Sequence, residues 1–169
     1  SGNQPQIYNG TAVITENGKP ALDFDGSNDE LTTGATIRTA TTFTVSREDD
    51  SDRGVIYGSV TNGLQYLRTG TGNVANFTNT NTLTHSITSG EHRLLYVNNP
   101  GTGTELGSNG GSTSSSNAAT NAFANFAIGQ KGNAFRMDGT IQEITIFGSD
   151  QSSNRTDIES DINTYFSIY

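Results

Sequence analysis

The sequence predicts an all-β protein, an antiparallel β-sandwich with one short helix at its C-terminal end. Its apolar residues fall in short clusters that contain β-branched and aromatic side chains. Turn residues separate these clusters at intervals of roughly 8–12 residues, which is the spacing of strands in a sandwich. One segment near the C-terminus has a helical repeat instead. Only 15% of the residues are charged, and together with the clustering this favours a folded chain over a disordered one.

Short β-type segments recur along the chain, joined by polar turns. Asn9-Gly10 and Asn62-Gly63 are dipeptides that favour tight hairpins, so the segments on either side of each are expected to pair. Residues 109–121 are rich in Gly, Ser, Thr, Asn and Ala and are expected to form a long loop or a weak edge strand. In chain order we predict strands at 6–8, 11–14, 21–24, 30–33, 43–46, 55–57, 64–68, 74–77, 82–87, 92–97, 123–130 and 139–147.

The segment His92–Val97 is the most apolar central run of the chain. Side chains alternate between the two faces of a sheet along a strand. Leu94 and Tyr96 should therefore face one side. Leu95 and Val97 should face the other. We expect this segment to span the centre of a sheet.

The helical repeat lies at residues 152–165, where a helix is predicted. Apolar side chains recur there at positions i, i+4, i+7 and i+8 and form a single stripe; they are Ile158, Ile162, Tyr165 and Phe166. Residues 149–154 offer several Ser, Asp and Asn side chains that could cap its first turn.

Composition excludes several classes of protein. The formal net charge is −8, and without a basic cluster the chain is a poor candidate for binding nucleic acid. No apolar run approaches 18 residues, so no membrane insertion is expected. The chain has no Cys, which excludes disulfides and thiolate metal sites. One domain is enough for 169 residues.

Two stretches near the chain ends resemble one known family. Near the C-terminus the pattern is Gly139, Ile141, Glu143, Ile144, Ile146 and Phe147; near the N-terminus it is residues 18–26 followed by Asp29 and Leu31. Both resemble the laminin-G-like branch of the concanavalin A-like lectin/glucanase superfamily. The resemblance implies a single jelly-roll domain over residues 1–169. Because the chain starts with Ser1 and its only Met is Met137, we expect a processed product or a fragment of a longer chain.

The closing segment, residues 148–169, is similar to a subset of these modules carried by phage virion proteins. That resemblance implies a non-enzymatic binding or display module at the virion surface, in a fibre, tail or capsid-decoration protein. Its expected partners are other virion proteins, host cell-surface glycans, or both, and a homotrimer is expected by the same resemblance. The alternative is a carbohydrate-binding or adhesin module of a secreted, extracellular bacterial protein.

A glycoside hydrolase is the weakest hypothesis, and we expect no enzymatic activity. Retaining glycosidases need two carboxyl groups about 5 Å apart, usually at alternate positions of a strand. Glu143 is the only candidate of this kind, and Ile141 and Thr145 occupy the alternate positions. Glu143 is therefore interpreted as a structural carboxylate that bonds turn backbone or an Arg.

Four residues are candidates for a sugar-binding face: Tyr57, Tyr66, Arg68 and Tyr96. Aromatic rings stack on sugar rings, and a guanidinium can fix the orientation of the ligand. The alternative is that most of these rings belong to the sandwich core.

Three carboxylates near the N-terminus are the candidate metal ligands: Asp23, Asp25 and Asp29. Ca²⁺ binds clustered carboxylate oxygens, so this loop is a possible Ca²⁺ site, and no other cofactor is expected. The alternative is that Asp25 and its neighbours form Asx turns, in which the side chains accept bonds from nearby backbone N–H groups.

Overall fold

The computed structural model describes residues 4–49, 54–60, 66–78, 82–115, 121–132 and 135–169.

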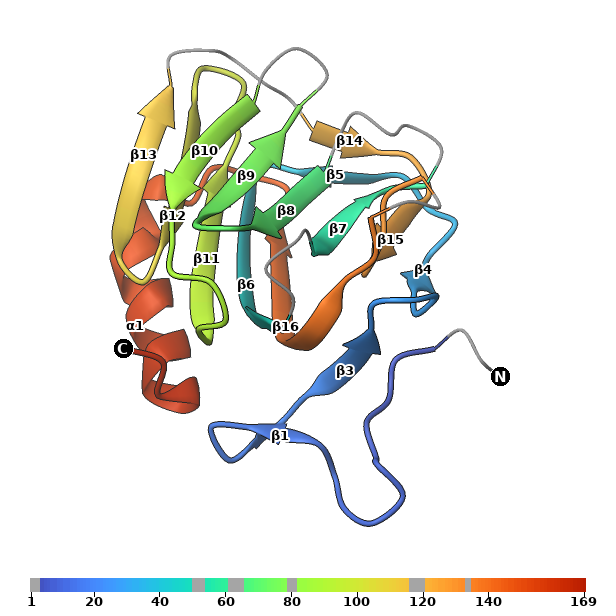
Figure 1. Cartoon of the computed structure of the whole chain (residues 1–169). Helices are drawn as coiled ribbons and strands as arrows, with labels where there is room; N and C mark the ends of the chain where they lie inside the picture. The colour runs from blue at the N-terminus through green and yellow to red at the C-terminus, as the bar shows by residue number, and fades with distance from the viewer. Residues whose placement is uncertain (1–3, 50–53, 61–65, 79–81, 116–120, 133–134) are drawn as a thin grey trace.

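The chain folds into two antiparallel six-stranded sheets that face each other (Figure 1). We name them by their central strands. The β6 sheet has the order β13-β12-β11-β6-β16-β3, and the β7 sheet has the order β10-β9-β8-β7-β15-β4. Two small two-stranded pairs, β1-β2 and β5-β14, complete the described strands. The expected antiparallel β-sandwich is confirmed.

Most elements overlap a predicted segment, but the strand predicted at 123–130 is divided into β14 and β15, which belong to different sheets. The β6 sheet consists of β3 (Leu22–Asp25), β6 (Thr41–Glu48), β11 (Arg93–Asn98), β12 (Thr104–Ser108), β13 (Gly111–Ser115) and β16 (Asp138–Phe147). The β7 sheet consists of β4 (Leu31–Thr32), β7 (Val55–Ser59), β8 (Tyr66–Gly70), β9 (Asn73–Phe77), β10 (Thr82–Ser86) and β15 (Phe126–Ile128). The small pairs are β1 (Thr15–Glu16) with β2 (Lys19–Pro20), and β5 (Ile37–Thr39) with β14 (Asn121–Phe123).

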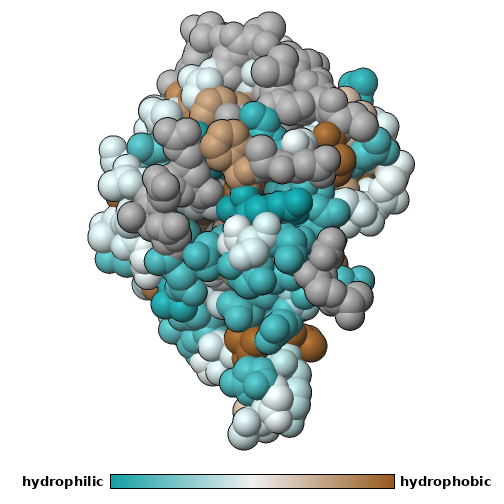
Figure 2. Space-filling model, turned by 45° about the vertical axis from the view of Figure 1, so that its right-hand side comes forward, coloured by the Kyte–Doolittle hydropathy of each residue, from teal (hydrophilic) through white to brown (hydrophobic). Residues whose placement is uncertain are grey.

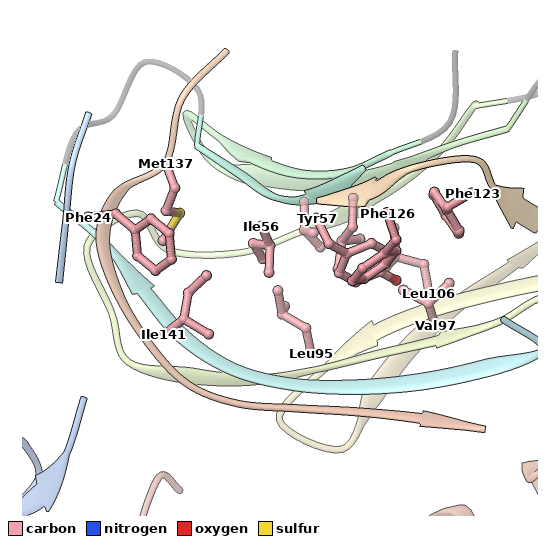
Figure 3. Close-up of a cluster of buried hydrophobic side chains, with 12 residues drawn as sticks. Phe24, Ile56, Tyr57, Leu95, Val97, Leu106, Phe123, Phe126, Met137 and Ile141 are labelled. Atoms are coloured by element: carbon pink, nitrogen blue, oxygen red, sulfur yellow. The ribbon is translucent and has the colours of Figure 1, made fainter. Parts of the chain in front are cut away.

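The main core lies between the two sheets and is aromatic at one end (Figure 3). The ring of Tyr57 stacks on Phe126 at 5.6 Å, and Phe123 meets both rings edge-on. Leu95 and Val97 reach into this core from β11. Such offset and edge-to-face pairs stabilise aromatic cores beyond the area that they bury.

A second apolar cluster covers the outer face of the β6 sheet. Leu94 and Tyr96 of β11 pack there with Phe43 of β6 and with Ile162 and Phe166 of the helix. The predicted alternation along residues 92–97 is therefore confirmed, and both faces of β11 are buried because the helix covers the outer one. In Figure 1 the red helix lies beside β11 and β12.

The helix itself begins with a 3-10 turn, Ser152–Asn154, and continues as α1 (Arg155–Phe166). Asn154 stands at the N-cap without a side-chain capping bond. At the other end Ser167 adopts a left-handed conformation with φ 55°, and its N–H donates to the Asn163 carbonyl. The guanidinium of Arg155 lies 4.2 Å above the Tyr96 ring, which anchors the first turn of α1 on the sheet.

The first predicted hairpin is shorter than expected. Tyr8 and Val13 form a single bridge across Asn9-Gly10. Three apolar side chains of this segment are exposed: Ile7, Tyr8 and Val13. Figure 2 shows apolar atoms gathered at the lower end of the molecule, the end at which this segment lies in Figure 1. Gln6 forms a second isolated bridge, to Asp23 of β3, so the segment is joined to the edge of the β6 sheet without forming a strand of either sheet.

Four of the described strands lie outside the predicted segments: β1, β2, β5 and β12. β5 and β12 carry one apolar side chain each, Ile37 and Leu106, so neither has an apolar pattern. Residues 111–115 form the edge strand β13. Of the two alternatives for residues 109–121, a long loop or a weak edge strand, this part of the segment follows the second. The hairpin turn expected at 61–63 lies outside the described residues, although β7 and β8 do pair.

Candidate functional site

An open pocket lies at one end of the β6 sheet, where β11 and β16 both finish. It has a volume of about 250 Å³. The end of β11 and the loop that leads to β12 form one wall, and the connection from β16 to α1 forms the other. The lining residues are Asn98, Pro100, Thr102, Gly103, Thr104, Glu105, Asp150 and Ser152. We call it the Asn98–Asp150 pocket.

Strand register explains why residues so distant in sequence meet there. Thr41, the first residue of β6, pairs with Asn98 on one side and with Phe147 on the other. β6 thus brings the ends of β11 and β16 level with each other. The two loops that leave these ends must then lie next to one another at the rim of the sheet.

Hydrogen bonds hold the floor of the pocket rigid. Asn98 is only 4% exposed. Its Oδ1 accepts from the Thr41 hydroxyl at 2.7 Å, and its Nδ2 donates to Oδ1 of Asp150 at 2.9 Å. The backbone N–H of Ser152 donates to the same carboxylate oxygen at 2.9 Å. A buried amide with both ends satisfied is a stable support for an exposed carboxylate.

These contacts also set the charge of the pocket. The backbone N–H of Ser152 lowers the pKa of Asp150, with smaller contributions from the Ser152 hydroxyl and from Asn98. Hydrogen bonds to a carboxylate favour its ionised form. Asp150 therefore stays negatively charged at neutral and mildly acidic pH.

Glu105 supplies the second carboxylate of the pocket. Its Oε1 accepts from Nη1 of Arg155 at 2.8 Å, and its Oε2 accepts from the Tyr96 hydroxyl at 3.3 Å. Burial and the Glu105 carboxylate raise the pKa of Tyr96, so this hydroxyl stays protonated and donates. Chemically, the pocket offers carboxylate oxygens, Thr and Ser hydroxyls, and the apolar ring of Pro100 to a small polar ligand.

The structure does not bring together Tyr57 and Tyr96, two of the four candidates for the sugar-stacking face. Tyr57 is 1% exposed and lies between the sheets, where its hydroxyl bonds the Thr42 hydroxyl at 2.7 Å. Tyr96 lies on the opposite face of the β6 sheet, under α1. Arg68 sits in β8 with its guanidinium 4.9 Å from the Phe77 ring centre. Tyr66 begins β8, and its side chain lies outside the described part of the chain.

The rings of Tyr57 and Tyr96 lie in different apolar layers because of strand alternation and the order of the layers. An aromatic side chain in a sandwich strand stabilises the core more by burial than by exposure. Of the three candidates whose side chains are described, only Tyr96 comes near the Asn98–Asp150 pocket. It does so through its hydroxyl on Glu105 rather than through an exposed ring face.

The three candidate metal ligands lie around one loop, but the hydrogen bonds fit the Asx-turn alternative. Oδ1 of Asp25 accepts from the backbone N–H of Ser27 at 2.8 Å, and Oδ2 of Asp29 accepts from the N–H of Asp25 at 3.0 Å. Burial, followed by the charge of Asp49, raises the pKa of Asp23. In the described part of the chain no three His, Asp or Glu side chains are grouped closely enough to hold a metal ion.

Glu143 takes a structural position beside a β-bulge of β16. Its Oε1 accepts from the Thr145 hydroxyl at 2.7 Å. The neighbouring bulge residue Gln142 clamps the β1-β2 turn, because its Nε2 donates to the carbonyls of Glu16 and Lys19 at 3.0 Å each. The expected partner of Glu143, an Arg or turn backbone, is thus replaced by a hydroxyl two residues along the same strand.

Sequence reasoning missed Asn98 and Asp150 as functional candidates. Asp150 was expected only as a possible cap of the helix, and Asn98 only as the start of a turn at residues 98–103. A usable signal was present, since each follows directly or closely on a strongly apolar strand. That signal becomes informative only when the ends of the two strands are known to be level.

Two solved structures show which known proteins share this fold. A chain of mouse laminin alpha1 containing domains LG4-5 matches with a TM-score of 0.57 and 16% identity, over 79% of this chain and 41% of the laminin chain. A heptameric SAP-like pentraxin from Limulus polyphemus matches with a TM-score of 0.60 and 12% identity, over 84% of this chain and 82% of the pentraxin. No protein-family model and no curated protein sequence matches the chain.

At these identities the likeness establishes the fold alone. The protein is a jelly-roll sandwich of the concanavalin A-like type, with one short C-terminal helix, as the sequence predicted. Among the described helices, none has the length and apolar character needed to cross a membrane.

Proposed function

We propose that this protein is a non-enzymatic binding module that contacts cell-surface glycans through the Asn98–Asp150 pocket. The observation that carries the proposal is the Asp150 carboxylate, held in place by the buried Asn98 amide at the mouth of a small open pocket. Sugar hydroxyls are donors that suit a fixed carboxylate, and binding groups that are ordered in advance cost less entropy on binding.

Two matched variants test the proposal. Thr102 is exposed and lines the pocket, so Thr102→Trp should fill it without disturbing the core. Thr164 is exposed on α1, outside the pocket lining, so Thr164→Trp is the control. A glycan array should give specific binding for the wild type and for the control variant. Loss of that binding in Thr102→Trp alone supports the proposal, and equal binding by all three chains refutes the pocket as the site.

A chelator arm of the same array tests the Ca²⁺ site that the sequence predicted at Asp23, Asp25 and Asp29. If Ca²⁺ at that loop supports glycan binding, a chelator should abolish the signal. Unchanged glycan binding in the presence of the chelator would show that binding at the pocket does not depend on Ca²⁺ at that loop.

We propose further that the module is displayed on a phage virion, in a fibre, tail or capsid-decoration protein, where it would contact other virion proteins as a trimer. The support is the similarity of residues 148–169 to segments of such proteins. The parent reading frame is the direct test. Capsid-like or tail-like segments would support virion display, whereas a signal peptide or a catalytic domain would support a secreted bacterial adhesin. Light scattering of the purified protein tests the trimer.

A further inference from the structure

We propose that the Asn98–Asp150 pocket is selective for an uncharged sugar residue with neighbouring hydroxyl groups, and that it rejects sulfated and sialylated glycans. This inference rests on the proposed glycan-binding function and names the ligand class of that same pocket.

The charges around the pocket are not balanced. Among the described residues, the lining includes the carboxylates of Glu105 and Asp150 and no Lys, Arg or His. Arg155, behind the wall, binds Glu105 at 2.8 Å and Glu159 at 2.9 Å, so its single positive charge is shared between two carboxylates. The hydrogen-bond partners of Asp150 are neutral, namely the Asn98 amide and the Ser152 N–H. Asp150 therefore presents a negative charge to the ligand.

Tyr96, whose hydroxyl bonds Glu105 of the pocket lining, also senses these carboxylates. After the larger effect of burial, the charges of Glu105 and, less strongly, Asp150 raise the pKa of Tyr96, while Arg155 lowers it. A sulfate or carboxylate on a ligand would meet the same potential. Repulsion between like charges is several-fold stronger at a partly buried site than in open water.

The geometry suits the hydroxyls of one sugar ring. Pockets for drug-sized ligands measure roughly 300–1,000 Å³, so a pocket of about 250 Å³ fits a smaller unit. Carboxylate oxygens accept charge-assisted hydrogen bonds from hydroxyls, which are stronger than bonds between neutral groups. The hydroxyl of Thr102 lies in the same lining and can complete a set of contacts to adjacent ring positions. Pro100 offers an apolar surface to the ring carbons.

The test uses pairs of oligosaccharides that differ only in one sulfate or one terminal sialic acid. The variant Asp150→Asn keeps an acceptor for Asn98 and Ser152 but removes the charge. The control Asp161→Asn removes one exposed carboxylate from α1, outside the pocket lining. Affinities are measured by titration calorimetry, and the fold of each variant is checked by circular dichroism.

We expect the wild type and Asp161→Asn to bind the neutral member of each pair at least about tenfold more tightly than the anionic member. Asp150→Asn should lose about tenfold in affinity for the neutral glycan, because a charged hydrogen bond becomes a neutral one. Asp150→Asn should also reduce the ratio of the affinity for the neutral glycan to the affinity for the anionic glycan.

Two other outcomes overturn the inference and can be told apart. If the wild type binds the anionic glycans as well or better, or if Asp150→Asn changes nothing, the charge selectivity is refuted while glycan binding stands. If the folded wild type binds no glycan of either kind, the proposed function is refuted and the inference with it.

Discussion

Arg93 and Glu48 form an ion pair in the interior of the protein, with side chains 2% and 1% exposed. The pair joins β11 to β6. Its remaining bonds reach the turn before β11: Nη2 of Arg93 donates to the Thr88 carbonyl, and Oε1 of Glu48 accepts from the N–H of Gly90 at 3.2 Å. Two buried charges are therefore compensated by each other and by backbone.

Glu48→Gln should destabilise the protein strongly. Removing one partner of a buried ion pair leaves an uncompensated charge and costs about 3–5 kcal/mol. Urea denaturation at neutral pH measures the change. Asp49→Asn is the matched control, because Asp49 pairs with Arg47 at 2.8 Å at the surface, with 42% and 34% of the two side chains exposed. It should cost no more than about 1 kcal/mol. Similar losses for both variants would show that the Glu48 pair contributes no special stability.

Gly139→Ala should destabilise β16 at its start. Gly139 has φ +131°, and an added Cβ would lie 2.2 Å from the carbonyl oxygen of Arg47. Backbone strain of this kind costs on the order of 1–3 kcal/mol, and the steric clash adds to it. Gly148→Ala, at the end of the same strand, meets nothing within 4 Å and should be nearly neutral. Thermal unfolding of the two variants checks the difference, and equal melting temperatures would contradict it.

Stability should fall as the pH is lowered from about 7.5 to 5.5, in part because of His92. Burial lowers the pKa of His92 below its ordinary value of 6.5 and outweighs the opposing effects of Gln142 and Glu16; Arg47 and Arg93 lower it further. The ring accepts from Nδ2 of Asn17 at 3.0 Å, an arrangement that a protonated Nδ1 cannot keep. As the pH falls through 6.5, the unfolded chain takes up the proton first, so the free energy of unfolding decreases.

His92→Gln removes this titration and should flatten the dependence on pH. Urea unfolding at a series of pH values measures the slope for the wild type and the variant. His85, whose pKa burial also lowers, remains in the variant, so some slope should persist. A variant with the same slope as the wild type would exclude His92 as a contributor.

Tyr57→Phe should lower stability and leave glycan binding unchanged. The Tyr57 hydroxyl is buried and bonds the Thr42 hydroxyl at 2.7 Å, so its loss should cost about 0.5–1.5 kcal/mol. Denaturation and a glycan titration on the same sample measure both properties. If the folded variant bound glycan more weakly, Tyr57 would have to be part of the binding site.

Much of the fold follows from local patterns in the chain. The alternation of residues 92–97 predicted which side chains of β11 face each layer, and the apolar stripe of residues 152–165 predicted α1, because both patterns express a repeat set by backbone geometry alone. β12 was not predicted, because its alternating side chains carry no apolar pattern. Only pairing with β11 and β13 makes it a strand.

The sequence by itself determined the class of the protein: an acidic, cysteine-free β-sandwich with one terminal helix. Tertiary structure alone decided where its chemistry lies. Tyr57 and Tyr96 entered different apolar layers because of the order in which the strands stack. Asn98 and Asp150 lie next to each other because β11 and β16, the two strands that pair with β6, end at the same level. A local pattern specifies which way a side chain faces, whereas the register between strands distant in sequence specifies which side chains become neighbours.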